Sequence, residues 1–568
     1  MSEAVGFCLV DEPWIQVRML DQSVSLMSLD GLFSNASAIG DLAGDLPTQD
    51  FAILRALLAI LQRAIISADD FVDSVDSAEV WGQLWHSEAL PIDKIRRYLE
   101  RWRHRFDLFD DRCPFMQVAT LRTPRDETTE IKKIIADVPD RFQFFTVRSG
   151  EAAQSLSFSE AARWLVHVHA YDMAGIKSGV VGDPQVKGGK SYPIGTGWTG
   201  RIGGVRVTGS NLRETLLLNL RLGRPNNPEA IVDILDLPAW EREPCGPGGL
   251  QREPTGQADV YTWQARRVRL VMEGDRVTRV VLTNGDKLEP HNRMELDPLT
   301  GWRRSPNQER VLKLPSVYLP RILDPNRALW RGLESLLPSE GKTGNGQDYL
   351  PPGIIQWIGY LSSDEAGAQI DANEVIQLQG VGIVYGTQNS TMVDLVNDIL
   401  LIRASLLSPE GLPFVALAKA CVHETEEAVV RLGSLAANLY LAAGGDSESV
   451  SGPREAAKAS AYSLIDDAFR RWLSSLTPGD TDPEVAEENA LQARDNWRRT
   501  AYKILLELGQ QLVHDSSPQA FAGHPQGGGK SWITSGKAER QFRFFLARTF
   551  EIDFGPAIST STTEEGGE

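Results

Sequence analysis

Residues 412–443 read LPFVALAKACVHETEEAVVRLGSLAANLYLAA, and the apolar residues of this stretch return every three or four positions. That period is typical of an amphipathic helix. Stretches with the same period lie at 393–407, 456–476 and 487–514. Short breaks separate them at 408–411, 444–445 and 478–479. Long helices joined by short breaks predict an antiparallel, four-helix bundle over residues 393–555.

Outward from this bundle, the last residues, 556–568, are rich in Ser, Thr and acids, and we expect them to be disordered. Residues 1–392 mix two periodicities instead. Helical spacing occurs at 51–66, 80–105 and 157–172, and residues 211–222 fit either an amphipathic helix or a buried strand. Strand-like alternation occurs at 7–18, 260–290 and 375–391, and Asn284-Gly285-Asp286 reads as the turn of a hairpin in the second of these. The predicted fold class is α+β: a large mixed N-terminal domain, 1–392, followed by the helical bundle.

Composition places the chain among globular proteins. Its 568 residues are 42% hydrophobic and 24% charged, enough for two or more domains with cores of their own. The most apolar early stretch, 51–66, is interrupted by Arg55, Gln62 and Arg63, which predicts a buried helix and not a membrane span. The net charge of −18 argues against a free-standing nucleic-acid binder, so any contact with nucleic acid must be local.

The cysteines and the N-terminus favour a cytoplasmic protein. The four cysteines lie far apart and form no CxxC pair, at Cys8, Cys113, Cys245 and Cys421. This pattern excludes a zinc knuckle and a disulfide framework. No basic segment followed by an apolar run opens the chain, so we expect no signal peptide.

Residues 175–209 are the strongest candidate for a ligand-binding loop. The stretch holds eleven glycines and five basic residues against one acid, Asp183. Glycine backbone and cations suit close contact with a phosphate-bearing polymer, and the alternative is a long surface loop. Gly189-Lys190-Ser191 resembles the end of a P-loop, but Pro184 occupies the position of the first glycine, so no nucleotide-binding motif is present.

The sequences of two further segments each allow two interpretations. Residues 141–151, RFQFFTVRSGE, interleave aromatic residues with arginines, which fits either a core strand or a platform for stacked bases. Arg97, Arg101 and Arg105 recur every four positions, which predicts one charged helical face, either solvated or in contact with RNA or another subunit.

No catalytic constellation is visible. The eight histidines are dispersed, and no HExxH, HD or GxSxG motif occurs. Cys421, His423 and Glu424 lie close together in sequence, but neighbouring residues of a helix point about 100° apart, so we expect an exposed or helix-packing role. His167 and His169, two positions apart on a helix, are poor metal ligands, and we expect core or surface histidines.

The order of several short motifs resembles the CasA family, the large subunit of the type I-E CRISPR surveillance complex Cascade. The motifs are LVDEPWIQVR at 9–18, PFMQ at 114–117, RFQFFTVRSGEA at 141–152, the glycine-rich stretch, NLRETLLLNL at 211–220, TWQ at 262–264, YGTQNS at 385–390 and VHETEE at 422–427. Each motif is weak alone. Their shared order, which runs through most of the chain, carries the resemblance.

The resemblance implies a non-catalytic recognition subunit without cofactor. Such a subunit holds the 5′ handle of the CRISPR RNA and reads the protospacer-adjacent motif (PAM) of double-stranded target DNA. It then promotes the first strand separation and recruits a helicase–nuclease. The implied partners are the CRISPR RNA, the target DNA, the other Cascade subunits and the helicase–nuclease, with no membrane. Some relatives carry a cysteine cluster in the middle region, but this chain has only Cys245 there, so we expect no zinc.

The resemblance also assigns residues to these roles. It places the RNA-handle contact on Phe144, Phe145, Thr146 and Val147. It places the PAM contact on Gly188, Gly189, Lys190 and Lys287, with Gly195-Thr196-Gly197 as an alternative glycine loop. It places a wedge that enters the base stack on Gln388 or Asn389. Two rival functions stay open: a protein-interaction scaffold without DNA contact, and an enzyme of unrecognised type.

Overall fold

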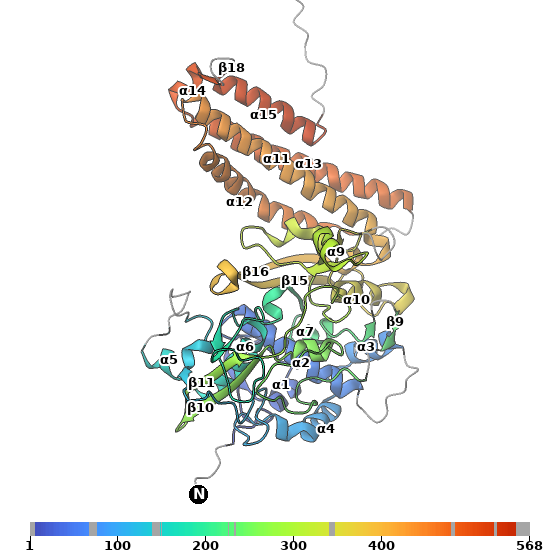
Figure 1. Ribbon diagram of the computed structural model, residues 1–568. Helices are drawn as coiled ribbons and strands as arrows, with labels where there is room; N and C mark the ends of the chain where they lie inside the picture. Colours follow the sequence, from blue (N-terminus) through green and yellow to red (C-terminus); the bar gives the residue numbers. More distant parts are fainter. Residues whose placement is uncertain are drawn as a thin grey trace, which may run out of the picture. The chain divides into compact units, whose positions relative to one another are not determined.

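The structure is a computed structural model that describes residues 6–66, 76–138, 148, 150–224, 227–231, 234–339, 347–478, 483–526 and 531–552 (Figure 1). The chain forms two compact units, 1–412 and 413–568. The predicted RNA-handle residues, 144–147, and the predicted disordered tail, 556–568, lie outside the described residues.

Helix α2 (Pro47–Ile66) forms the core of the first unit. It is apolar on all sides, and 18 of its 20 residues are buried, as expected of a helix enclosed by protein. It packs against α4 (Ile92–Trp102), α6 (Phe158–Tyr171) and α8 (Gln257–Tyr261). Helix α6 begins with a capping box between Ser157 and Glu160. The helices predicted at 51–66 and 157–172 are confirmed.

The polar residues of α2 have buried partners. Arg55 pairs with Asp297 at 2.8 Å, Gln62 donates to Asp236 at 3.2 Å, and Arg63 pairs with Glu241 at 2.8 Å. These contacts explain how three polar side chains are accommodated in an otherwise apolar helix. No helix in the described part of the chain is long and apolar enough to cross a membrane.

Antiparallel sheets of three strands make up most of the strand structure in the described part of the first unit. Their orders are β2-β1-β3, β10-β11-β4, β13-β12-β14 and β16-β15-β7. The strands are β1 Ile15–Met19, β2 Val24–Met27, β3 Ile39–Leu42, β4 Thr129–Glu130, β7 Gly204–Thr208, β10 Arg266–Glu273, β11 Arg276–Asn284, β12 Trp302–Arg304, β13 Tyr318–Pro320, β14 Tyr349–Leu350, β15 Val375–Tyr385 and β16 Met392–Arg403. Two short pairs are β5 Lys177–Ser178 with β6 Lys190–Ser191, and β8 Gly223–Arg224 with β9 Asn227–Ile231. Other helices of the unit are α1 Leu29–Ser34, α3 Ser77–Trp85, α5 Glu151–Gln154, α7 Leu212–Leu218, α9 Pro306–Leu312 and α10 Gly353–Leu361.

Residues 393–407 do not form the predicted helix. Residues 392–403 are strand β16, which pairs with β15 along its whole length, from Val375 opposite Arg403 to Tyr385 opposite Met392. Short 3-10 turns follow. Cross-strand pairing thus overrides a helix-like spacing of Leu and Ile. The strand belongs to the first unit, and the two units divide between Leu412 and Pro413.

The hairpin predicted within 260–290 is present, but its turn lies elsewhere. Glu273 of β10 pairs with Arg276 of β11, so Gly274 and Asp275 form the connection. Gly274 has a φ of +63°, which glycine adopts without strain. Asn284, the first residue of the predicted turn, is instead the last residue of β11, and Gly285 and Asp286 follow the strand.

The predicted helix at 80–105 is interrupted. Helix α3 ends at Trp85 and α4 begins at Ile92. Arg97 and Arg101 are exposed on α4, whereas Arg105 lies in a 3-10 turn and donates to the carbonyl oxygen of Arg242 at 2.7 Å. The three arginines therefore do not share one helical face.

The second unit confirms the predicted C-terminal helical region. Its long helices among the described residues are α11 Leu412–Ala442, α12 Ser451–Ser475, α13 Pro483–His514 and α15 Ser535–Thr549. The short helix α14 (Pro518–Ala522) and the hairpin β17 (His524–Gln526) and β18 (Ser531–Ile533) precede α15. Phe469 of α12 packs edge-on against Trp497 of α13, with ring centroids 4.8 Å apart.

The VHETEE motif joins helices of this bundle. Glu424 of α11 forms ion pairs with Arg498, at 2.7 Å, and with Arg494 of α13. Cys421 is buried, which raises the pKa of its thiol to about 12. A thiol with so high a pKa stays protonated at neutral pH and is a poor nucleophile. Of the two predicted roles, Cys421 and Glu424 have the helix-packing one, whereas His423 is exposed.

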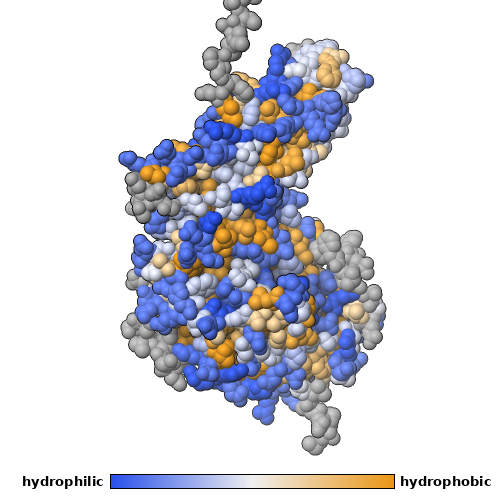
Figure 2. All heavy atoms as spheres, turned by 180° about the vertical axis from the view of Figure 1, so that it is seen from behind, coloured by the Kyte–Doolittle hydropathy of each residue, from blue (hydrophilic) through white to orange (hydrophobic). Residues whose placement is uncertain are grey.

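The surface mixes side chains of both kinds. On the face that Figure 2 shows, hydrophilic side chains surround several separate groups of apolar ones. Isolated apolar groups of this kind are normal on a globular protein and do not by themselves mark a binding site.

Candidate nucleic-acid interface

The glycine-rich stretch contains a short hairpin with an open tip. Strands β5 and β6 pair, and Lys187 and Lys190 exchange backbone hydrogen bonds of 3.0 and 3.1 Å. Gly188 and Gly189 form the two-residue turn between these lysines, at the end of the longer connection from β5 to β6, with φ values of +57° and +72°. A two-residue turn of this type needs positive φ at both positions, which explains the paired glycines. A Cβ atom at either position would meet nothing within 4 Å, so the backbone of the tip is open to a partner.

Only part of the predicted positive charge lies on this tip. Lys187 and Lys190 are exposed, and neither has an ion-pair partner among the residues that the structure describes. The other three basic residues serve the fold. Lys177 pairs with Asp172 at 2.6 Å, Arg201 donates to backbone carbonyls, and Arg206 pairs with Asp41 at 2.5 Å. The exposed positive charge of the stretch is therefore limited to Lys187 and Lys190, although its composition includes five basic residues.

The alternative glycine loop, Gly195-Thr196-Gly197, is enclosed. A Cβ atom on Gly195 would approach the guanidinium of Arg201 to 1.8 Å, and one on Gly197 would approach the carbonyl oxygen of Ala170 to 2.3 Å. These glycines allow tight packing and do not present backbone to a partner. Of the two glycine candidates, only Gly188-Gly189 is accessible.

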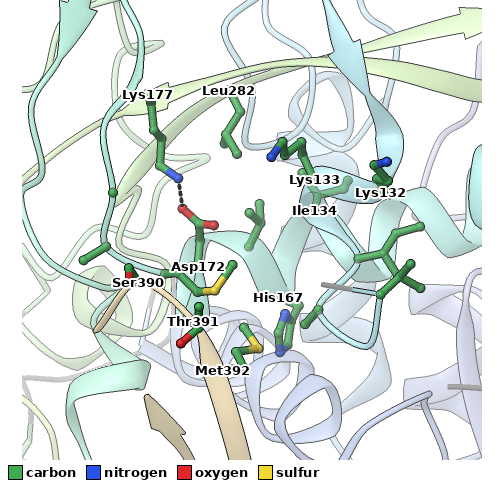
Figure 3. A pocket seen from close by; sticks show the side chains of 17 residues that line it. Lys132, Lys133, Ile134, His167, Asp172, Lys177, Leu282, Ser390, Thr391 and Met392 are labelled. Atoms are coloured by element: carbon green, nitrogen blue, oxygen red, sulfur yellow. Dashed lines mark ion pairs between the residues drawn. The ribbon is translucent and has the colours of Figure 1, made fainter. Parts of the chain in front are cut away.

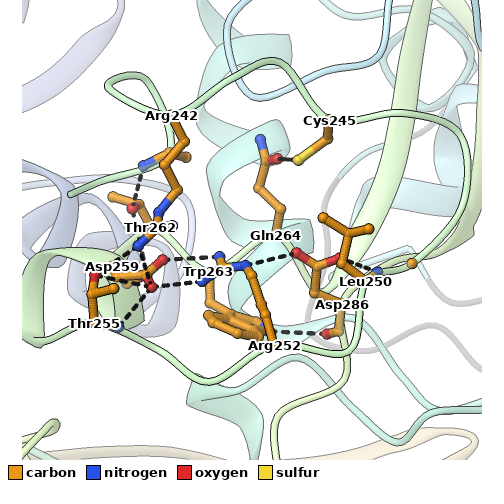
Figure 4. Close-up of polar contacts among 12 residues, drawn as sticks. Arg242, Cys245, Leu250, Arg252, Thr255, Asp259, Thr262, Trp263, Gln264 and Asp286 are labelled. Atoms are coloured by element: carbon orange, nitrogen blue, oxygen red, sulfur yellow. Dashed lines mark hydrogen bonds and ion pairs between the residues drawn. The ribbon is translucent and has the colours of Figure 1, made fainter. Parts of the chain in front are cut away.

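Lys287 follows a residue that is held from several sides. Its own side chain is exposed and pairs with Glu289 at 2.5 Å. The preceding Asp286 is buried and accepts from the backbone N–H of Leu250 at 2.8 Å and from the guanidinium group of Arg252 (Figure 4). The guanidinium group of Arg267 also donates to it. A buried carboxylate with three donors is well satisfied. The backbone at Lys287 is thereby fixed, and its exposed side chain is paired with Glu289.

The same polar network holds the connector before β10. Asp259 pairs with Arg252 at 2.6 Å and with Arg242 at 2.8 Å (Figure 4). The guanidinium of Arg252 lies 3.9 Å from the ring centroid of Trp263. Cys245 donates from its thiol to Gln264 at 2.7 Å, and burial raises its pKa. This network could not be predicted from the sequence, because its partners lie up to 36 positions apart, as Leu250 and Asp286 do.

Asn284 joins the glycine hairpin to the strand that ends before Lys287. Its side-chain amide donates to the carbonyl oxygen of Tyr192 at 2.9 Å and to the hydroxyl of Ser191 at 3.2 Å. The residue predicted as a turn former is therefore a bridge between two of the predicted site loops. Ser191 lies two positions after Gly189, and Lys287 lies three positions after Asn284.

The hairpin β15–β16 ends in the predicted polar tip. Gln388 and Asn389 are exposed and have φ values of +56° and +55°. The carbonyl oxygen of Asn389 accepts from the backbone N–H of Ala174 at 2.9 Å, immediately before the glycine-rich stretch. The hydroxyl of Tyr385 donates to the carbonyl oxygen of Tyr171 at 2.5 Å and anchors the hairpin on the end of α6. Left-handed backbone at Gln388 is uncommon and costs roughly 1 kcal/mol.

Arg148, at the end of the predicted RNA-handle segment, belongs to an internal ion cluster. Its guanidinium pairs with Asp45 at 3.0 Å, with Glu160 at 3.1 Å and with Asp137 at 3.5 Å. Three carboxylates neutralise this arginine, so it is not the phosphate clamp that the sequence pattern indicated. The cluster fixes the point at which the segment rejoins the described fold.

The two histidines of α6 are core residues, as predicted. His167 lies 3.1 Å from the hydroxyl of Thr48, and His169 lies 2.8 Å from the carbonyl oxygen of Met116. Burial lowers their pKa values to about 3 and about 4, so both rings are neutral at physiological pH. No cluster of three metal-ligating side chains occurs within the described ranges.

Comparison with known proteins identifies the family. The model of the family described as CRISPR-associated protein Cse1 matches residues 9–508. The chain belongs to this family. A curated Cse1 relative, CRISPR-associated protein CasA/Cse1 of Thermus thermophilus, is 32% identical over 351 residues, which make up 60% of this chain and 62% of that protein. The resemblance to the CasA family is confirmed.

Solved Cse1 structures share the fold. Cse1 of Thermobifida fusca superposes with a TM-score of 0.83 at 38% identity, covering 97% of this chain and 99% of that one. Cse1 of Acidimicrobium ferrooxidans gives 0.77 at 29% identity, with the same coverage. A chain of a CRISPR RNA-guided surveillance complex gives 0.68 at 18% identity, covering 95% of this chain and 99% of that one, which is a likeness of fold.

Proposed function

We propose that this Cse1-family chain is the non-catalytic recognition subunit of a type I-E CRISPR RNA-guided surveillance complex. It binds the 5′ handle of the CRISPR RNA, reads the PAM in double-stranded target DNA, promotes the first step of R-loop formation and recruits the helicase–nuclease. The observation that carries the proposal is the linkage of three exposed loops. Asn284 joins the Gly188-Gly189 tip to the Lys287 segment, and Ala174 joins the same stretch to the Gln388-Asn389 tip.

The glycine tip and Lys287 are suited to reading a minor groove. Groove edges there offer few distinguishing groups, so open backbone and one lysine accept several related PAM sequences. The open space around Gly188 and Gly189 lets the backbone approach the sugar–phosphate edge closely. Lys187 and Lys190 add a local positive charge on a chain whose net charge is −18. Other subunits then have to supply most of the phosphate neutralisation.

The tip of β15–β16 is suited to opening the duplex. Gln388 and Asn389 present exposed amides on a turn that is anchored on α6 through Tyr385. An amide inserted into a base step replaces hydrogen bonds that the opened pair loses. Pairing with the guide RNA then supplies the sequence specificity, so the protein has to read only the short PAM.

Co-purification tests the proposal. The tagged chain, expressed with the other genes of its system, is expected to recover a defined small RNA and several further subunits. If the subunits are recovered but the assembly does not capture DNA selectively by its PAM, the chain is a protein-interaction scaffold and the proposed recognition function is wrong. A metal-dependent nuclease assay on the isolated chain tests the third possibility, and cleavage by that chain would contradict a non-catalytic role.

A separate variant tests the assignment of the RNA handle. If Phe144 and Phe145 stack on the RNA, each Phe→Ala change weakens retention of this subunit by the complex by about 1–3 kcal/mol. The melting temperature of the isolated chain is expected to change little. A fall of many degrees would instead identify the residue as part of the core and remove it from the RNA contact.

A further inference from the structure

A cavity of about 340 Å³ borders the tip of the β15–β16 hairpin (Figure 3). Ser390, Thr391 and Met392 line it, and they follow directly after Gln388 and Asn389. Other lining residues include Lys132, Lys133, Ile134, Asp172, Lys177 and Leu282. The volume lies within the range of small-molecule sites in proteins. None of the roles derived above uses this cavity.

The lining combines apolar walls with a polar edge. Ile134, Met173, Leu282 and Met392 contribute apolar surface. The ion pair of Asp172 and Lys177 points into the cavity from one side, and Lys133 lies across from it (Figure 3). Asp172 is buried, which opposes ionisation, but Lys177 and Arg266 hold the pKa of its carboxyl below the usual value. The site therefore keeps a charged acceptor and a charged donor side by side.

This chemistry fits a flat group with apolar faces, hydrogen-bonding edges and an attached phosphate. A nucleobase meets apolar walls with its faces and meets Asp172, Lys177 and the hydroxyls of Ser390 and Thr391 with its edge. Lys133, and Lys132 beside its surface pair with Glu130 at 2.7 Å, place positive charge near the phosphate. We propose that the cavity receives a single unstacked nucleotide, an inference that rests on the proposed function.

The position of the cavity gives the reason for such a site. A wedge that enters a base step forces a base out of the stack, at a cost of a few kcal/mol. Water stabilises the freed base only poorly, because its faces are apolar. A cavity that begins one residue after Asn389 accepts that base at the place where it leaves the duplex. The nucleotide comes either from a DNA strand beside the PAM or from the guide RNA, and probes in each distinguish the sources.

Gly175 offers a way to fill the cavity without disturbing the fold. It lines the cavity, a Cβ atom added there meets nothing within 4 Å, and its φ lies outside the left-handed region. Gly175→Phe therefore occupies the space without backbone strain, and Gly175→Ala is too small to do so. Gly246→Phe is the matched control, because a Cβ atom there also meets nothing within 4 Å and the residue does not line the cavity.

The test uses the assembled complex with 2-aminopurine placed singly in the displaced strand, in the target strand beside the PAM, or in the RNA handle. At one position, acrylamide quenching is expected to fall about tenfold when the complex forms, equivalent to ~1.4 kcal/mol of sequestration. Gly175→Phe is expected to restore the quenching, whereas Gly175→Ala and Gly246→Phe leave it low. The strand that responds identifies the source.

An abasic nucleotide at the responding position provides a second measurement that does not depend on the fluorophore. Without a base to accept, wild type and Gly175→Phe are expected to form R-loops at equal rates. The inference is overturned if no probe position is protected, or if Gly175→Phe leaves every protected position unchanged. Selection of PAM-bearing over scrambled duplex, measured on the same wild-type samples, separates this failure from failure of the proposed function.

Discussion

At the scale of the residue, the candidate interface depends on backbone conformations that few amino acids adopt. Gly188 and Gly189 take positive φ values without cost, whereas Gln388 and Asn389 take them as side-chain-bearing residues. Uncommon conformations of this kind persist where the surrounding structure holds them, and they concentrate at functional sites. Here the anchor is the hydrogen bond from Ala174 to Asn389.

Gly189→Asp adds a Cβ atom and a negative charge where we expect backbone to approach phosphate. Like charges brought together cost several kcal/mol, so capture of a PAM duplex by the complex is expected to fall by more than about 100-fold. Gly189→Asn has the same shape and the same demand on φ but no charge, and it is expected to lose less. Equal losses in filter binding would show that shape or strain, and not charge, explains the defect.

At the scale of the element, part of the fold was readable from the sequence and part was not. The core helix α2 and the capped helix α6 follow from apolar spacing and a Ser–Glu capping pair, which are local signals. Strand β16 was misread because its Leu and Ile residues fit a helix equally well, and only pairing with β15 decides between them. Asn284 was misread because its partners, Ser191 and Tyr192, lie more than 90 positions away.

Part of the candidate site, like part of the fold, could be predicted from the sequence. The exposed tips, Gly188-Gly189 and Gln388-Asn389, were predicted, because glycine pairs and polar hairpin ends are visible in sequence. Their linkage, the network around Asp286 and the cavity beside Met392 were not, because each is built from distant segments. Lys177, Arg201 and Arg206 were expected among the exposed phosphate-contacting cations of the loop, but each has an internal partner.

The Gln388-Asn389 tip is expected to act in opening the duplex and not in capturing it. Replacing both residues by alanine should slow R-loop formation on intact duplex. Mismatching the first base pairs beside the PAM removes about 1.4 kcal/mol per step, so the defect should shrink on such a target. The Gly189→Asp defect should persist there. If the mismatched target rescues both variants equally, the two tips share one role and this division is wrong.

The Glu424 cluster makes the stability of the second unit sensitive to pH. Burial raises the pKa of Glu424, but hydrogen bonds from Arg498 and Arg494 outweigh this and hold it below the ordinary value of 4.5. The cluster therefore stabilises fully above about pH 4.5, and its contribution is lost as the pH falls through the lower, folded-state pKa.

Glu424→Gln is expected to cost about 3 kcal/mol at neutral pH, because it leaves two arginines between helices with less compensation. Hydrogen exchange of α13 in the full chain measures this change. Glu427→Gln is the matched control on the same helix, since its pair with Arg431 is exposed and worth under about 0.5 kcal/mol. Equal exchange rates in the two variants would contradict a structural role for the cluster.

At the scale of the whole molecule, the net charge predicts that the isolated chain binds DNA more weakly than the assembled complex does. A net charge of −18 opposes binding to a polyanion, and the exposed lysines of the glycine tip are a small local exception. Reading a PAM is therefore expected to need other subunits that hold the duplex against this chain. We therefore expect this chain to contribute recognition of the PAM and the assembly to contribute most of the affinity for DNA.

Filter binding of a PAM-bearing duplex and a duplex with a scrambled PAM, to the isolated chain and to the assembled complex, tests this claim most directly. The isolated chain is expected to bind both duplexes weakly and alike. The assembled complex is expected to prefer the PAM-bearing duplex by at least about tenfold, or ~1.4 kcal/mol. Nanomolar, PAM-selective binding by the chain alone, or equal binding of both duplexes by the complex, would contradict the account.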